Sequence, residues 1–159
     1  MNDETWFLII TIEHIKNEID MGLFDFLKPK KKKQVLTFYS ERLTDVEKVS
    51  INLMMVFIVT HLGQRVAHSE EKKFVTIVSN EILGLNNQII SNLKGENFDY
   101  TKVVYSLELE NKKFFAGTFI ELANIIKDQS VMKLVAVIVE DMGLSFEDVV
   151  KEHYKGINM

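Results

Sequence analysis

Cysteine is absent from this 159-residue sequence, and proline occurs once, at Pro29. Without cysteine the chain can form neither disulfides nor thiolate metal sites, which agrees with a reducing compartment. The N-terminal region also lacks a long apolar segment, since the longest uncharged apolar run there covers only residues 6–12. That run is too short to cross a bilayer, and acidic Asp3 and Glu4 precede it where a signal peptide carries Lys or Arg. We therefore expect a cytoplasmic protein.

The sequence also lacks the motifs of common catalytic and cofactor sites. Its seven glycines are scattered along the chain, most of them near the ends of expected helices, so they form no Gly-rich phosphate loop. No Gly-x-Ser-x-Gly nucleophile elbow is present. Carboxylates that are adjacent in the sequence diverge by about 100° on a helix, so they are not arranged to share a proton. We therefore predict a non-enzymatic protein without a cofactor.

Charge is distributed unevenly along the chain. The formal net charge is −4, but residues 1–20 sum to −4 and residues 21–33 to +4, which leaves the remainder mildly acidic. A mildly acidic body is not expected to have a general affinity for nucleic acid. The basic charge is therefore a local feature of one segment.

Helix signals dominate what is present. Apolar residues recur at helical spacing over residues 8–19, which predicts an N-terminal helix that ends at Gly22. Residues 44–47 read Thr-Asp-Val-Glu, a capping box that predicts the start of a central, deeply buried helix. Further caps and glycines predict helices at about 69–83, 86–93, 99–109, 112–127, 128–142 and 145–154. The expected fold is all-α, a compact bundle of about seven to eight helices.

One hydrophobic core is expected to join these helices. Residues 74–78 and 131–139 are rich in β-branched side chains, and the alternative is that they form buried strands. Neither run is bounded by a hairpin dipeptide, and each leads into a helix-ending glycine, so helices are favoured. The predicted core residues are Leu53, Val56, Phe57, Val75, Val78, Phe119, Leu122, Leu134 and Val137.

A shift of the chain by 59 residues reveals a likeness between its two halves. Ser69 then falls on Asp128, and both are residues that cap helix N-termini. Gly84 falls on Gly143, and each glycine ends an apolar stripe and is followed by leucine and a further cap. The pattern predicts two helical hairpins that repeat one another.

These two hairpins, each with a turn at its middle and a second helix ending in Gly-Leu before Asn86 or Ser145, resemble the TerB family of tellurite-resistance proteins. The resemblance covers about residues 44–154. It implies the family's helical fold, and in that family acidic residues of the two turns have been taken as a cation site.

The two turns depart from the family pattern. The first keeps Gly63 and Glu70 or Glu71 but has His61-Leu62 where the family has Ala-Asp. The second keeps Asp128 but lacks the glycine that follows and the glutamate at the start of its helix. Hard cations need several converging oxygen ligands. We therefore expect the fold to be shared and the cation site to be lost.

The candidate metal ligands of the chain are His61, His68, Glu70 and Asp128. Two histidines and a carboxylate near Gly63 could in principle bind zinc or nickel. The simpler interpretation places His61 in a last helical turn, where a cation suits the helix dipole, and His68 in a solvated loop. No bound metal is expected.

Residues 22–33 form the most unusual local segment, with aromatic residues followed by a run of lysines. Pro29 and the mutually repelling lysines predict a linker, which divides the chain into an N-terminal helix with a Lys-rich linker (1–33) and an all-α domain (34–159). The favoured interpretation is a solvated tether. The alternative is contact with an anionic membrane or a polyanion, at about 1 kcal/mol per basic residue near a membrane, through Phe24, Phe26, Lys28, Lys30, Lys31, Lys32 and Lys33.

The leading functional hypothesis is a non-enzymatic, TerB-like helical module that binds a protein partner in a bacterial stress or envelope-associated system. A homo-oligomer is a further possibility, because the apolar face of the N-terminal helix needs a cover. The first alternative is a peripheral membrane or nucleic-acid binder that uses residues 22–33, with nucleic acid the less expected partner. The second alternative is a divalent-metal-binding protein.

Overall fold

The computed structural model describes residues 39–61 and 64–157, and it confirms the all-α fold class. Within this described part no strand occurs, so residues 74–78 and 131–139 are helical. The helical elements are α3 (Asp45–Thr60), α4 (Ser69–Ile77), the π-helix η2 (Val78–Ile82), α5 (Asn87–Leu93), α6 (Tyr100–Tyr105), α7 (Leu109–Ile126), α8 (Gln129–Asp141) and α9 (Phe146–Ile157). The N-terminal helix and linker predicted for residues 1–33 lie outside the described residues.

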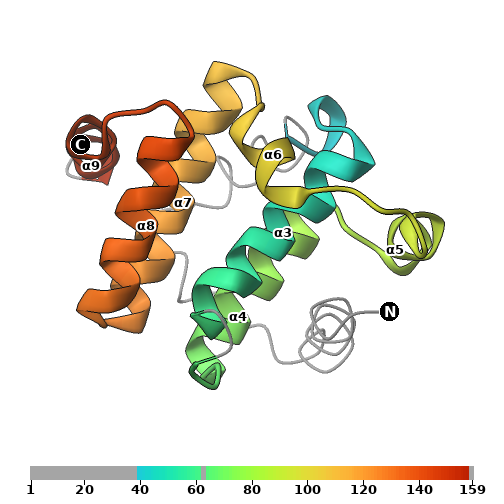
Figure 1. The fold of residues 1–159 in the computed structure, drawn as a ribbon, viewed down its shortest axis with the longest axis horizontal. Coiled ribbons are helices and arrows are strands. Elements are labelled where there is room, and N and C mark those ends of the chain that lie inside the picture. The colour runs from blue at the N-terminus through green and yellow to red at the C-terminus, as the bar shows by residue number, and fades with distance from the viewer. Residues whose placement is uncertain (1–38, 62–63, 158–159) are drawn as a thin grey trace.

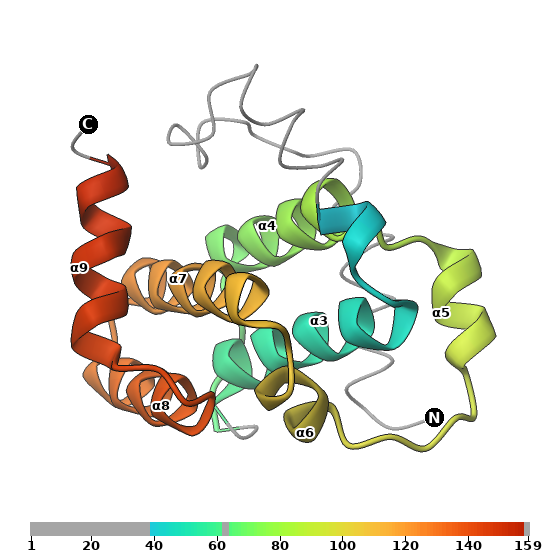
Figure 2. The same cartoon turned by 90° about the horizontal axis from the view of Figure 1, so that it is seen from above.

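The helices are arranged around α3 (Figures 1 and 2). In both views α3 lies between α4 and α6, the pair α7 and α8 lies to one side, and α9 and α5 occupy opposite ends of the molecule. The predicted capping box begins α3: the Glu47 backbone N–H donates to Thr44 Oγ1 at 3.2 Å, and the Thr44 N–H donates to Glu47 Oε2 at 2.8 Å. Because neighbours cover it on several sides, α3 is buried along most of its length, as predicted.

Most of the predicted core residues are buried together. Val137 is the clear exception, because 57% of its surface is exposed. Phe57 and Leu134 are half-buried and pack against the core from its edge. The buried members are Leu53, Val56, Val75, Val78, Phe119 and Leu122.

The error at Val137 has a physical cause in η2, the π-helical turn that continues α4. The N-caps of α4 and α8 are His68 and Asp128, so before η2 the two hairpins match at a shift of 60. Beyond η2 the hairpins match at a shift of 59 residues, because Gly84 corresponds to Gly143 and both have positive φ. The π turn adds one residue to the first hairpin. Val78 therefore corresponds to Ile138, which is buried, and Val137 faces outward.

The two hairpins share further details. Each first helix ends on a non-glycine residue in the left-handed conformation, His61 (φ 45°) in α3 and Lys127 (φ 59°) in α7. After each second helix a leucine N–H donates a hydrogen bond to a carbonyl of that helix. Leu85 donates to Ser79 O at 2.9 Å, and Leu144 donates to Val139 O at 3.2 Å. The first of these bonds spans one residue more than the second, as the π turn requires.

Several helix boundaries differ from prediction, including the end of α9, which lies at Ile157 rather than near residue 154. The N-cap of α4 is His68 rather than Ser69. The helix expected over residues 99–109 ends at Tyr105, and α7 begins at Leu109 rather than near residue 112. An extended Glu108 separates these helices, and no glycine or proline marks that break in the sequence.

Helix α9 packs across α7 and the end of α8. His153 lies 3.1 Å from the Glu121 carboxylate of α7, and the Asn124 amide hydrogen-bonds to the Tyr154 hydroxyl. The His153 ring lies over Gly117, where an added Cβ would be only 3.0 Å from Nδ1. These contacts hold α9 against α7, the helix that also packs on α8.

Candidate functional site

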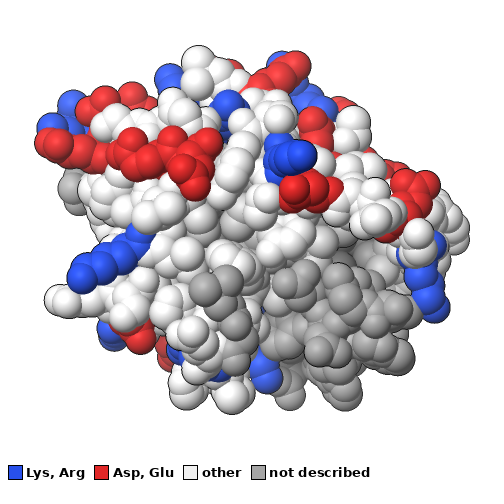
Figure 3. Space-filling model, in the orientation of Figure 1, with Lys and Arg blue, Asp and Glu red and all other residues white. Residues whose placement is uncertain are grey.

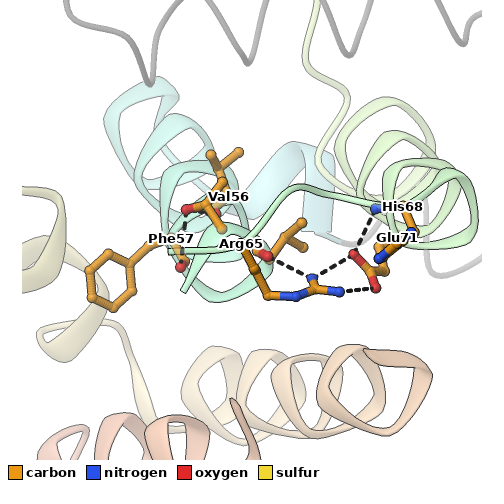
Figure 4. Close-up of polar contacts among 7 residues, drawn as sticks. Val56, Phe57, Arg65, His68 and Glu71 are labelled. Atoms are coloured by element: carbon orange, nitrogen blue, oxygen red, sulfur yellow. Dashed lines mark hydrogen bonds and ion pairs between the residues drawn. The ribbon is translucent and has the colours of Figure 1, made fainter. Parts of the chain in front are cut away.

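The turn between α3 and α4 contains an ion pair between the half-buried Arg65 and the buried Glu71 (Figure 4). Arg65 donates from Nη1 to Glu71 Oε2 and from Nη2 to Oε1, each at 2.7 Å, and Nη1 also donates to Val59 O at 2.7 Å. The His68 backbone N–H donates to Glu71 Oε2 at 3.0 Å. Glu71 is only 3% exposed, so its carboxylate serves to close this turn.

The electrostatics of the pair favour two charged groups. Burial acts to raise the pKa of Glu71, but the hydrogen bonds from Arg65 and the His68 N–H, together with the Arg65 charge, lower it overall. The Glu71 hydrogen bond is the main reason that the pKa of Arg65 is raised, against the opposing effect of burial. Because Glu71 already accepts from three donors, a cation would have to displace Arg65 to bind it.

The turn between α7 and α8 is stabilised by Asp128, which accepts from the Ser130 N–H at 2.7 Å. This hydrogen bond is the main cause that lowers the pKa of Asp128, and the charge of His61 lowers it further. The two turns therefore lie close enough for an electrostatic interaction. The carboxylate nevertheless acts as a helix cap.

The four candidate metal ligands do not assemble into a cluster. His61 ends α3, His68 and Asp128 cap α4 and α8, and Glu70 is exposed in the first turn of α4. Across residues 39–61 and 64–157, no three His, Asp or Glu side chains converge as metal ligands would. The candidate membrane-contact residues, Phe24 to Lys33, lie outside the described residues.

A shallow apolar groove opens between α8 and the start of α9, on the surface that we call the α8–α9 surface. Its volume is about 400 Å³. Val137, next to the lining residue Ala136 in the sequence of α8, is a large exposed apolar residue. The lining residues are Gln129, Met132, Lys133, Ala136 and Phe146.

The charges around this groove are segregated. Lys133 is exposed in its wall near the beginning of α8. At the other end the Glu140 carboxylate accepts from the Phe146 backbone N–H at 3.0 Å, and Glu147 and Asp148 follow on α9. Figure 3 shows acidic side chains gathered over α9 and the adjoining end of α8. Lys151 of α9 pairs with Glu147 at 2.7 Å, but Glu140 and Asp148 add further acidic charge, so the groove has one basic end and one acidic end.

Sequence reasoning missed this surface because it assigned Val137 to the core. A signal was present, since α8 carries apolar residues at positions 132, 136 and 137 in addition to its buried stripe. A helix with more apolar positions than its neighbours can cover leaves some of them exposed. The Arg65–Glu71 pair was missed too, because no sequence pattern indicates that Arg65 of the loop contacts Glu71 of the following helix.

Comparison with known proteins adds no relative: no family model, no curated protein and no solved structure matches this chain. In the part of the chain that the structure describes, no helix is long and apolar enough to cross a membrane.

Proposed function

We propose that this chain is a non-enzymatic helical interaction module that binds a protein partner through the α8–α9 surface. The observation that carries the proposal is the apolar groove lined by Met132, Ala136 and Phe146, on a helix that also exposes Val137. Apolar surface rimmed by charged residues is typical of sites that bind other proteins. The acidic end supplies a charged rim that favours a basic partner segment.

The polar groups of the described residues support a binding role over a catalytic one. Glu71 is held by Arg65, Asp128 caps α8, and Glu121 contacts His153. Each of these carboxylates has a structural partner, and none is joined by a nucleophile in a pocket. The TerB-like assignment and a role in a bacterial stress or envelope-associated system stay predictions.

The proposal is tested by placing a charge in the groove. Ala136→Glu introduces a carboxylate between Met132 and Phe146, and Ser91→Glu makes the same charge change on exposed α5, at the opposite end of the molecule (Figures 1 and 2). The full chain and both variants are used to capture proteins from extracts of the source cells, after thermal unfolding shows that all three are folded.

We expect at least one protein to be retained by the unmodified chain and by Ser91→Glu, and to be lost by Ala136→Glu. Recovery of the same proteins by all three chains would refute the proposal.

A further inference from the structure

We infer that the α8–α9 surface binds residues 22–33 of the same chain, so that the Phe/Lys-rich segment is a built-in ligand with which any partner must compete. This inference rests on the proposed function of the surface as a docking site. The segment itself lies outside the described residues, and its sequence, Gly-Leu-Phe-Asp-Phe-Leu-Lys-Pro-Lys-Lys-Lys-Lys, supplies the chemistry.

The apolar parts of groove and segment match in kind. The groove offers Met132, Ala136 and Phe146, and its volume of about 400 Å³ suits an aromatic side chain. The segment offers Phe24 and Phe26 within a few residues. A methionine beside aromatic rings is a favourable contact, because its flexible thioether adapts to the shape of the ring.

The charges match in order as well as in sign. On α8, Lys133 and Glu140 are two helical turns apart, about 10 Å along the axis. In the segment, Asp25 precedes the lysines that begin at Lys28. If Asp25 lies at the Lys133 end, the lysines reach Glu140, Glu147 and the rest of the acidic end. A single orientation therefore pairs opposite charges at both ends, and the reverse orientation pairs like charges at both.

Chain length permits this contact within one molecule. The first described residue, Tyr39, is held next to α7, where its ring stacks on Phe114 at 4.2 Å between centroids and meets Phe115 edge-on at 5.4 Å. The twelve residues from Leu27 to Tyr39 can extend about 40 Å. A domain of this size has a radius of gyration of only about 13–14 Å. The segment can therefore reach the far side of the domain.

Tethering also makes a weak contact sufficient. A short linker holds the segment at an effective concentration near the millimolar range, so occupancy does not require high intrinsic affinity. A protein partner with its own basic and aromatic segment would have to displace it. The N-terminal segment therefore raises the concentration or affinity that a partner needs in order to bind the groove.

The test uses the full chain and exploits its lack of cysteine. A Gly22→Cys variant provides a unique attachment point for a nitroxide spin label, at the end of the segment and outside the matched residues. The intensities of the methionine methyl NMR signals of the isotopically labelled chain are then compared with the spin label oxidised and reduced. The Met132 signal is identified as the one that is missing from the spectrum of Met132→Leu. The matched control carries the same label and replaces Lys28 and Lys30 to Lys33 with Gln.

We expect the Met132 signal to lose intensity in the Gly22→Cys chain and to recover in the Lys→Gln control and at high salt. Full intensity of the Met132 signal in the spin-labelled chain overturns the inference. The inference is also overturned if the Met132 signal loses the same intensity in the Lys→Gln control. A loss seen only when spin-labelled and isotopically labelled chains are mixed assigns the segment to a second copy and also overturns it. So does immobilisation of the label by phosphatidylserine vesicles with Met132 unaffected, since the segment would then be a membrane ligand.

Two results separate this inference from the proposed function. If the Met132 signal keeps its full intensity and Ala136→Glu no longer captures the partner, the internal ligand is rejected and the interaction module stands. If the Met132 signal is broadened but Ala136→Glu captures the same proteins as the unmodified chain, the interaction module is rejected and the internal ligand stands.

Discussion

The Arg65 guanidinium donates to both carboxylate oxygens of Glu71 at 2.7 Å while it also reaches Val59 O, at the end of α3. One side chain therefore joins the last turn of α3 to the first turn of α4. The contact is buried, with side-chain exposures of 18% for Arg65 and 4% for Glu71. The stability of the first hairpin should depend on both charges.

Replacing Glu71 with Gln should lower the free energy of unfolding by about 1.5–3 kcal/mol, because the half-buried Arg65 loses a charged hydrogen-bond partner. Urea unfolding at neutral pH measures the loss. An exposed pair, Glu147 and Lys151 at 2.7 Å on α9, provides the control. Glu147→Gln should change the free energy of unfolding by less than about 1 kcal/mol.

The same pair should make stability depend on acid pH. The pKa of Glu71 is lowered by folding from an ordinary value of 4.5, so its stabilising effect is complete above that pH and is lost as the pH falls through the lowered value. The difference in stability between the unmodified chain and Glu71→Gln should therefore shrink in that range. A difference that stays constant from pH 7 to strongly acid conditions would contradict this assignment.

Core substitutions should rank by burial. Phe119 is fully buried in α7, and Phe119→Ala should cost about 3–5 kcal/mol. Phe57→Ala should cost less, because Phe57 is only half-buried. Val137→Ala should stay within about 0.5 kcal/mol of the unmodified chain. Chemical unfolding of the three variants gives the order, and a large loss at Val137 would place that residue back in the core.

The two helix-ending glycines should differ in their tolerance of alanine. Gly143 has φ +83° and no neighbour near an added Cβ, so Gly143→Ala should cost only the left-handed strain of about 1–2 kcal/mol. Gly84 has φ +66°, and its added Cβ would lie 2.9 Å from Ser40 Oγ, so Gly84→Ala should cost more. Melting temperatures of both variants test this order, and Gly84→Ala with Ser40→Gly should recover part of the difference.

Divalent cations should leave the melting temperature nearly unchanged. Only a ligand that prefers the native state stabilises it, and the described turns hold Glu71 and Asp128 in structural contacts. Calcium, magnesium and zinc are each added to the metal-free protein in a thermal unfolding series. A clear increase that Asp128→Ala or Glu70→Ala abolishes would establish a cation site at the turns.

A chain that begins at Gln34 should remain cooperatively folded. The described core is formed by residues from Leu43 to Val149, and Tyr39 already packs on Phe114 and Phe115. Thermal unfolding of the full and shortened chains tests the boundary predicted between residues 33 and 34. Loss of the cooperative transition on shortening would place the N-terminal helix in the core.

Local signals in the sequence predicted local structure well. The Thr44 and Glu47 pair begins α3, and Gly84 and Gly143 adopt positive φ after the helices they end. These features depend on residues a few positions apart, so their spacing is visible in the sequence. The sequence also correctly favoured helices over strands for residues 74–78 and 131–139.

Features that depend on packing were not predictable in the same way. Val137 and Ile138 are equally apolar, and only the neighbours of α8 decide that one is exposed and the other buried. Arg65 and Glu71 meet because the loop folds back on α3, which no periodicity encodes. The groove between α8 and Phe146 likewise exists only once α9 has been placed by His153 and Tyr154.

The extra residue in η2 has a consequence for how this chain can be aligned, with itself or with other proteins. Each residue of an α-helix advances the side chain by about 100°, so an ungapped alignment of the two hairpins pairs inward positions with outward ones on one side of the π turn. A correct alignment needs a one-residue gap inside a helix, between His68 and Gly84, where alignment scoring normally penalises gaps most. No single constant shift therefore aligns the two hairpins over their whole length: a shift of 59 aligns Gly84 with Gly143, and a shift of 60 aligns His68 with Asp128.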